Sequence, residues 1–126
     1  KEFAKSTILN ADGRLLMAVL PASQKVDLER LRNLTRANRL ELATEDEFVS
    51  AFPDCERGAE PPFGGLYGLE VFVDDALTGN RKIAFNAGTH REAIRIDFET
   101  YRRLARPVIA SFAFVPASHE AGAWGG

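Results

Sequence analysis

Apolar residues form two nearly continuous runs near the start of the chain. The runs span 6–9 and 15–20, and Asn10, Asp12 and Gly13 lie between them. An Asp-Gly pair between apolar runs is a strong signal for a β-hairpin. Because neither run alternates regularly with polar residues, we expect both strands to lie inside a sheet.

The apolar period then changes to that of a helix. Leu28, Leu31 and Leu34 recur three residues apart behind Asp27, which predicts a helix with Asp27 as its N-cap. Residues 40–43 alternate and predict a short strand.

A second helix is expected to begin behind Thr44. Thr44 and Glu47 have the spacing of a capping box, in which each side chain satisfies a backbone amide of the first turn. The helix should run to about Phe52, because Pro53 cannot continue it.

The second half of the chain predicts three strands and one helix. The strands are expected at 68–74, 81–85 and 92–96. Asp97 should cap a short helix that ends before Pro107 and contains Phe98, Tyr101 and Leu104. Residues 108–112 form either a last strand or a docked end.

This order of elements predicts an α+β fold with a mixed, largely antiparallel central sheet surrounded by helices. It differs from the alternating order of a doubly wound nucleotide-binding fold. We expect one domain over residues 1–115 and a flexible Gly/Ala-rich tail over 116–126.

Composition and charge narrow the class of protein. The 126 residues include 45% hydrophobic and 27% charged residues, as in an ordinary globular protein. The net charge of −2 argues against a broad nucleic-acid groove but allows contact with a few terminal nucleotides. One cysteine, no apolar run of membrane-spanning length and no signal peptide favour a cytoplasmic location with no membrane partner.

Familiar catalytic motifs are missing from the sequence. It has no P-loop, no nucleophile elbow and no dinucleotide fingerprint, and its two histidines and one cysteine lack metal-ligand spacing. We therefore expect no metal and no cofactor. If the protein is an enzyme, its catalysis depends on backbone groups and on substrate positioning.

The segment 52–64 is the best candidate for such backbone groups. Gly58 allows close approach of a ligand, while Pro61 and Pro62 restrict the chain around it. Such a loop can hold amides in an array suited to a carbonyl oxygen or an oxyanion. The alternative is a plain turn between a helix and a strand.

Three side chains also have two interpretations each. Lys5, at the mouth of the first strand, is either an anchor for phosphate or carboxylate or a solvated charge. His90 either contacts a substrate or lies in a surface turn. No basic helix terminus and no partner histidine lies beside Cys55 in sequence, which favours a structural or incidental thiol over a nucleophile.

Taken together, four stretches resemble the YbaK/prolyl-tRNA synthetase-associated domains, which are aminoacyl-tRNA deacylases. The stretches are 3–23, 42–64, 66–75 and 83–107. The resemblance implies a curved central sheet with a cleft between sheet and helices. It also implies hydrolysis of the ester that joins a wrong amino acid to the 3′ end of tRNA.

The resemblance also implies functional residues, through a lysine, a G-x-x-x-P loop and a Gly-Thr-His turn. The implied catalytic residues are Lys5 and Gly58, and the implied substrate-binding residues are Ala59, Pro62, Gly88, Thr89 and His90. Amides near Gly58 would stabilise the developing negative charge, and Lys5 would anchor the terminal nucleotide. The vicinal ribose hydroxyl would orient the attacking water.

The implied substrate is alanine, cysteine or serine on a non-cognate tRNA such as tRNA-Pro, recognised at its 3′ terminal adenosine. A synthetase or an elongation factor is a further implied partner. A non-catalytic module that binds tRNA ends, small ligands or a protein is the alternative, and an inactive truncated domain is a third. Relatives carry a helix ahead of the lysine strand, so a trimmed fragment and an open-pocket variant both remain open. Gln24 also replaces a histidine that many relatives have.

Overall fold

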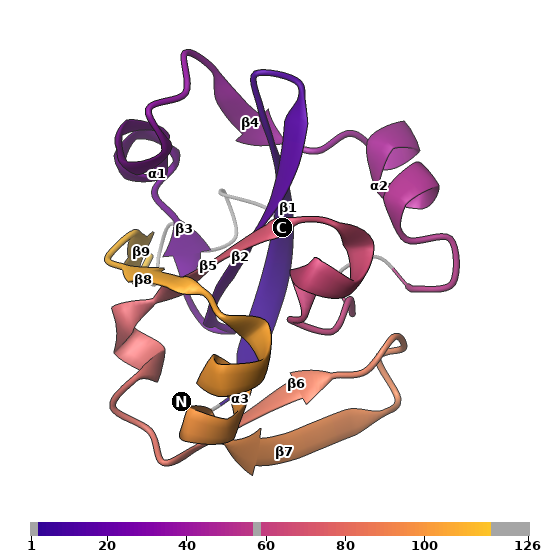
Figure 1. Cartoon of the computed structure of the whole chain (residues 1–126), viewed down its shortest axis with the longest axis vertical. Coiled ribbons are helices and arrows are strands. Elements are labelled where there is room, and N and C mark those ends of the chain that lie inside the picture. Colours follow the sequence, from indigo (N-terminus) through magenta and orange to yellow (C-terminus); the bar gives the residue numbers. More distant parts are fainter. Residues whose placement is uncertain (1–2, 57–58, 117–126) are drawn as a thin grey trace.

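The computed structural model describes residues 3–56 and 59–116 (Figure 1). Its centre is a long hairpin of two strands, β1 (Ala4–Ala11) and β2 (Arg14–Pro21), which pair antiparallel. At the hairpin turn, Asp12 and Gly13 have φ of 54° and 92°, and the amide of Gly13 donates to Asn10 Oδ1 at 2.7 Å. The predicted hairpin is confirmed, and both strands are longer than their apolar runs.

The main sheet has five strands in the order β4-β1-β2-β5-β8. β4 (Leu40–Leu42) pairs antiparallel with β1, whereas β5 (Glu70–Asp74) runs parallel to β2 and β8 (Val108–Ala110) runs parallel to β5. The sheet is therefore antiparallel on one side and parallel on the other, which confirms the predicted mixed sheet. β1 and β2 both lie in its interior, as their apolar runs predict.

Both faces of this sheet are covered, so the apolar run of β2 is buried on alternate sides. The first core contains Ala4, Ile8, Met17, Val19, Val71 and Val73 of the sheet, packed with Phe48, Phe52, Phe85, Phe98 and Tyr101. The second core contains Leu9, Leu16, Ala18, Leu20 and Phe72, packed with Leu31 and Phe112.

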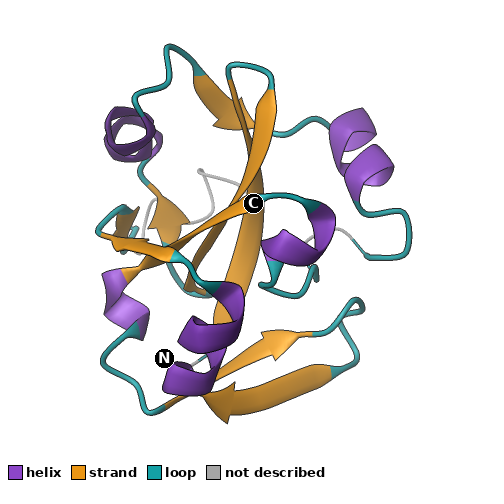
Figure 2. Cartoon of the chain, viewed as in Figure 1, coloured by secondary structure: helices purple, strands orange, loops and turns teal. Residues whose placement is uncertain are grey.

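Figure 2 shows the helices in purple, and the first two of them begin as their capping residues predict. In α1 (Leu28–Thr35), Asp27 accepts the amide of Arg30 at 3.0 Å. In α2 (Glu45–Ala51), the capping box of Thr44 and Glu47 is formed. Of the three leucines that predicted α1, Leu31 is buried, while Leu28 and Leu34 are 36% and 46% exposed. The contact of this short helix with the core is therefore centred on Leu31.

The third helix, α3 (Phe98–Ala105), also forms, but its capping differs from the prediction. Asp97 is the N-cap residue, yet its carboxylate makes no capping hydrogen bond and lies 3.1 Å from Lys82 Nζ. Lys82 lies opposite Asp97 in the register of β6 and β7, so the carboxylate contacts the lysine instead of the first turn of α3. Phe98 and Tyr101 are buried, whereas Leu104 is 66% exposed.

A second hairpin precedes α3 and lies beneath the main sheet in Figure 1. It consists of β6 (Lys82–Asn86) and β7 (Ala93–Asp97), and Phe3 bridges in parallel to Ala84, so the start of β1 runs beside β6. The short pair β3 (Lys25–Val26) with β9 (Ala113–Phe114) and the 3₁₀ turns η1 (Gly64–Tyr67) and η2 (Asp75–Leu77) have no clear sequence signal. Among the described residues, no helix has the length and apolar character needed to cross a membrane.

Candidate functional site

The loop that follows α2 is anchored at its start by aromatic packing. Phe52 is 1% exposed, and its ring centroid lies 5.5 Å from that of Phe48 and 4.4 Å from that of Tyr67. Large buried aromatic side chains contribute strongly to packing. The chain therefore leaves α2 from a fixed position.

The middle of this loop is tied to the turn between β6 and β7. The amide of Gly88 donates to the carbonyl of Ala59 at 2.8 Å, and the amide of Glu56 donates to the carbonyl of Gly88 at 2.8 Å. The carboxylate of Glu56 also accepts the amide of His90 at 2.8 Å. The structure thus brings Ala59 together with Gly88 and His90, which lie far from it in the sequence.

Gly88 has a conformation that this turn requires. Its φ of +97° lies in the region that residues with a side chain rarely adopt. The amide of Ala87 closes the turn on the carbonyl of Glu92 at 3.0 Å, and the hydroxyl of Thr89 accepts the amide of Arg91 at 3.3 Å. The Gly-Thr-His turn is therefore a built structure, and the side chain of His90 at its tip is exposed.

The end of the loop is tied to α3. Tyr101 is fully buried, and its hydroxyl donates to the carbonyl of Pro62 at 2.7 Å. Burial raises the pKa of Tyr101 well above its ordinary value, so the hydroxyl keeps its proton. Phe63 packs edge to face on Tyr101 and Phe85, with centroids 5.3 and 5.6 Å apart.

Backbone hydrogen bonding limits which amides of the loop could meet a substrate. Among the described residues of the loop, five backbone amides donate to carbonyls of the protein: those of Phe52, Cys55, Glu56, Ala59 and Phe63. Pro61 and Pro62 have no N–H to offer. Ala59 is buried and its amide donates to the carbonyl of Glu56, so this amide is already used within the protein. Gly58, the predicted catalytic glycine, lies outside the described residues, together with Arg57.

Two ionisable side chains of the loop, those of Glu60 and Cys55, are buried to an extent that the sequence did not indicate. Glu60 is only 4% exposed, although it lies between an alanine and a proline of the G-x-x-x-P loop. Cys55 is half-buried, and its Sγ lies 3.8 Å from the hydroxyl of Tyr67. Burial, followed by contact with Cys55, raises the pKa of Tyr67. The described contacts of Cys55 are those of a packed thiol.

Lys5 lies on β1, opposite Leu20 of β2. Its neighbours Ala4 and Ser6 are buried on the side of the first core, so the lysine side chain lies on the other face and is half-buried. Burial, and then repulsion from Lys25, lower the pKa of Lys5. The parallel bridge of Phe3 to Ala84 places this strand beside the strand that leads into Gly88, but the loop packs on the first core, and among the described residues no hydrogen bond or ion pair joins Lys5 to it.

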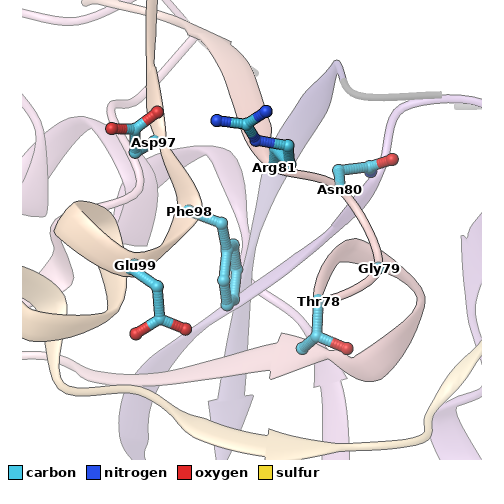
Figure 3. A pocket seen from close by; sticks show the side chains of 7 residues that line it. All are labelled: Thr78, Gly79, Asn80, Arg81, Asp97, Phe98 and Glu99. Carbon is cyan, nitrogen blue, oxygen red and sulfur yellow. The ribbon is translucent and has the colours of Figure 1, made fainter.

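A separate polar hollow of about 380 Å³ lies at the start of α3 (Figure 3). Seven residues, from the turn between η2 and β6, the end of β7 and the start of α3, line it: Thr78, Gly79, Asn80, Arg81, Asp97, Phe98 and Glu99. Its carboxylates are paired with cations, since Asp97 contacts Lys82 and Glu99 contacts Arg102. Across residues 3–56 and 59–116, no cluster of three or more His, Cys, Asp or Glu side chains could hold a metal ion.

Comparison with known structures supports the fold. A protein described as a candidate trans-editing enzyme for prolyl-tRNA synthetase superposes with a TM-score of 0.81 over 90% of this chain and 71% of its own. The sequence identity is 20%, so this likeness concerns the fold.

Comparison with known sequences gives the family. The proline–tRNA ligase of Bacillus subtilis is 30% identical over 92 residues, and that of Caldicellulosiruptor saccharolyticus is 34% identical over 81 residues. These matches cover 68% and 61% of this chain but only 15% and 13% of the ligases. The sequence model of the aminoacyl-tRNA editing domain matches residues 1–104. The chain therefore belongs to the aminoacyl-tRNA editing domain family.

Proposed function

We propose that the chain is a deacylase that hydrolyses mischarged aminoacyl-tRNA in trans. The observation that carries this proposal is the attachment of the G-x-x-x-P loop to both the Gly-Thr-His turn and α3, within a chain of the editing family. A loop fixed at both ends supports positioned backbone donors, which suit a reaction that needs no strong protein nucleophile.

In the proposed reaction, water adds to the ester carbonyl and the bond between the acyl carbon and the ribose oxygen breaks. The products are the free amino acid and tRNA with a free terminal hydroxyl. Amides at Gly58 would stabilise the oxyanion of the intermediate, and Lys5 would bind the phosphate of the terminal nucleotide. The vicinal ribose hydroxyl would orient the water.

The proposed substrates are tRNAs, such as tRNA-Pro, that carry alanine, cysteine or serine. Size exclusion would reject longer side chains, because a closed pocket discriminates by steric clash. Gly88 and Thr89 would shape the rim of this pocket through the turn, and Ala59 and Pro62 through the loop. His90, exposed at the tip of the turn, would contact the substrate.

Deacylation of Ala-tRNA-Pro, Cys-tRNA-Pro and Ser-tRNA-Pro tests the proposal. Wild-type protein should release the amino acid well above the rate of spontaneous hydrolysis, and Lys5→Ala and Gly58→Ala should reduce that release. Equal ester loss with and without wild-type protein would leave the non-catalytic binding module as the better description. Undiminished activity of Lys5→Ala would remove the role given to Lys5.

A further inference from the structure

Charge is distributed unevenly along the chain. Residues 81–106 contain seven Lys or Arg and three Asp or Glu, whereas the rest of the chain contains nine Lys or Arg and fifteen Asp or Glu. The unit of β6, β7 and α3 is therefore basic within a protein of net charge −2. A local basic surface on an acidic protein is suited to one anionic partner at one place.

Helix α3 presents part of this positive charge away from the core. Its inner side carries the buried Phe98 and Tyr101, while its last turn and C-cap carry three exposed arginines. A hollow of about 580 Å³ is lined by Arg102, Arg103, Arg106, Pro107 and Ile109. We call this the arginine hollow.

The requirements of the helix do not account for all three arginines. Arg102 pairs with Glu99 at 2.8 Å, and cations in a last helical turn favour the helix dipole. Among the described residues, Arg103 makes one long hydrogen bond of 3.5 Å with the hydroxyl of Thr100, and its charge acts on Glu99 more weakly than that of Arg102. Arg106 is the C-cap in the left-handed region, with φ 50° and ψ 54°, where a glycine would be less strained by about 1 kcal/mol. Folding alone therefore favours a different residue at position 106.

The arginine hollow and the candidate site are linked through the same helix. Tyr101, next to Arg102, donates to the carbonyl of Pro62 in the G-x-x-x-P loop. The width of one α-helix, about 10 Å, thus separates the loop from the outward face of α3. A ligand held at the loop would have to extend over about one helix width to reach the arginine hollow on the outward face of α3.

We propose that the arginine hollow binds the phosphodiester backbone of the acceptor end of tRNA while the loop receives the 3′ terminal ester. This inference rests on the proposed function and adds a second contact to the same substrate. Guanidinium groups match phosphate oxygens in a bidentate geometry and lose less hydration than ammonium groups do. Such contacts position the RNA without reading its bases, and they weaken as salt rises.

The test measures binding of an uncharged tRNA-Pro transcript over a range of KCl concentrations, by fluorescence anisotropy. Arg103→Gln and Arg106→Gly should each weaken binding severalfold and should each lower the slope of log K against log salt by about 1. Thermal unfolding checks the fold, and Arg106→Gly should be at least as stable as wild type.

Arg36→Gly is the matched control. Arg36 is the exposed C-cap of α1, with φ 60° and ψ 26°, so its replacement removes the same charge and relieves the same strain. Because Leu31 of α1 packs in the second core whereas Phe98 and Tyr101 of α3 pack in the first, the two helices lie on different faces of the sheet, and Arg36→Gly should leave binding and its salt slope unchanged. Equal weakening by Arg36→Gly and Arg106→Gly would overturn the inference, as would wild-type protein that does not bind tRNA at low salt.

Deacylation separates this inference from the proposed function. If wild-type protein hydrolyses mischarged tRNA and the α3 variants have unchanged KM, the arginine hollow is wrong and the deacylase stands. If no ester is hydrolysed but binding of the transcript depends on Arg103 and Arg106, the deacylase is wrong and the arginine hollow stands as a tRNA-binding surface.

Discussion

The hydroxyl of Tyr101 donates a buried hydrogen bond of 2.7 Å to the carbonyl oxygen of Pro62. This bond joins α3, which lies late in the chain, to the G-x-x-x-P loop, which lies 39 residues earlier. The carbonyl has no water to replace its partner, because both residues are buried. The position of the loop therefore depends on a helix that contributes no predicted site residue.

Tyr101→Phe should destabilise the fold and lower deacylation. The substitution keeps the ring but leaves a buried carbonyl unsatisfied, which costs about 1–3 kcal/mol of unfolding free energy. Urea unfolding measures this loss. Tyr67→Phe is the matched control: its hydroxyl is partly exposed, with a weak contact of 3.8 Å to Cys55, so its removal should change stability little. Equal stability of the two variants would contradict the role given to the Tyr101 hydroxyl.

Gly88→Ala should destabilise the turn that holds Ala59 and Glu56. An added Cβ meets no atom within 4 Å, so the expected cost comes from the backbone alone, at a φ of +97°. That strain should lower the unfolding free energy by about 1–3 kcal/mol. Gly79→Ala provides the comparison, since it also meets no atom within 4 Å and has no positive φ. Gly79→Ala should be neutral or slightly stabilising in the same urea titration, and deacylation should fall for Gly88→Ala only. A Gly88→Ala protein as stable as wild type would contradict this explanation.

Short sequence patterns predicted the hairpins and helices that depend on residues close together in the chain. The hairpin of β1 and β2 follows from a turn sequence and two apolar runs, and α1 and α2 follow from Asp27 and Thr44. Asp97 was predicted to cap α3 by the same reasoning, but Lys82 on the paired strand takes its carboxylate. Cross-strand pairing depends on register, which a local pattern does not contain.

The sequence predicted those residues of the candidate site that belong to the G-x-x-x-P loop and the Gly-Thr-His turn. The resemblance named Ala59, Gly88 and His90, and the structure brings these three together. It did not name Glu56 or Tyr101, whose hydrogen bonds span 34 and 39 residues. A charged residue in a turn and an aromatic residue in a helix are common, so neither has a sequence signal of its own.

Asp74→Ala should be among the most destabilising single substitutions in the sheet. The Asp74 carboxylate is 3% exposed and accepts three backbone amides, those of Ala76, Phe112 and Ala113, at 2.8–2.9 Å. Their loss should cost about 3 kcal/mol or more, because hydrogen bonds to a charged group are stronger than neutral ones and the amide of Phe112 remains buried. Asp75→Ala, at an exposed neighbouring carboxylate, should cost far less in the same unfolding experiment. Similar losses for the two variants would mean that the three amides find other partners.

Lys5→Met should make the folded protein more stable at neutral pH while lowering deacylation. Burial and Lys25 lower the pKa of Lys5 in the folded state below its ordinary value of 10.5, so folding disfavours the charged form. At any pH below the lowered pKa the lysine is charged in both states, and the whole destabilisation is present.

The advantage of Lys5→Met should shrink as pH rises. Above the lowered pKa of Lys5 the folded protein loses the proton first, so wild-type stability recovers between that pKa and 10.5. Urea unfolding at pH 7 and near pH 10 measures this change. Lys25→Met should raise the pKa of Lys5 only part of the way toward 10.5, because repulsion from Lys25 is the second cause of the shift after burial. A Lys5→Met protein less stable than wild type at pH 7 would mean that contacts of the lysine stem outweigh its charge. If Lys5→Met is more stable but inactive, the charge at this position serves the substrate at the expense of the fold.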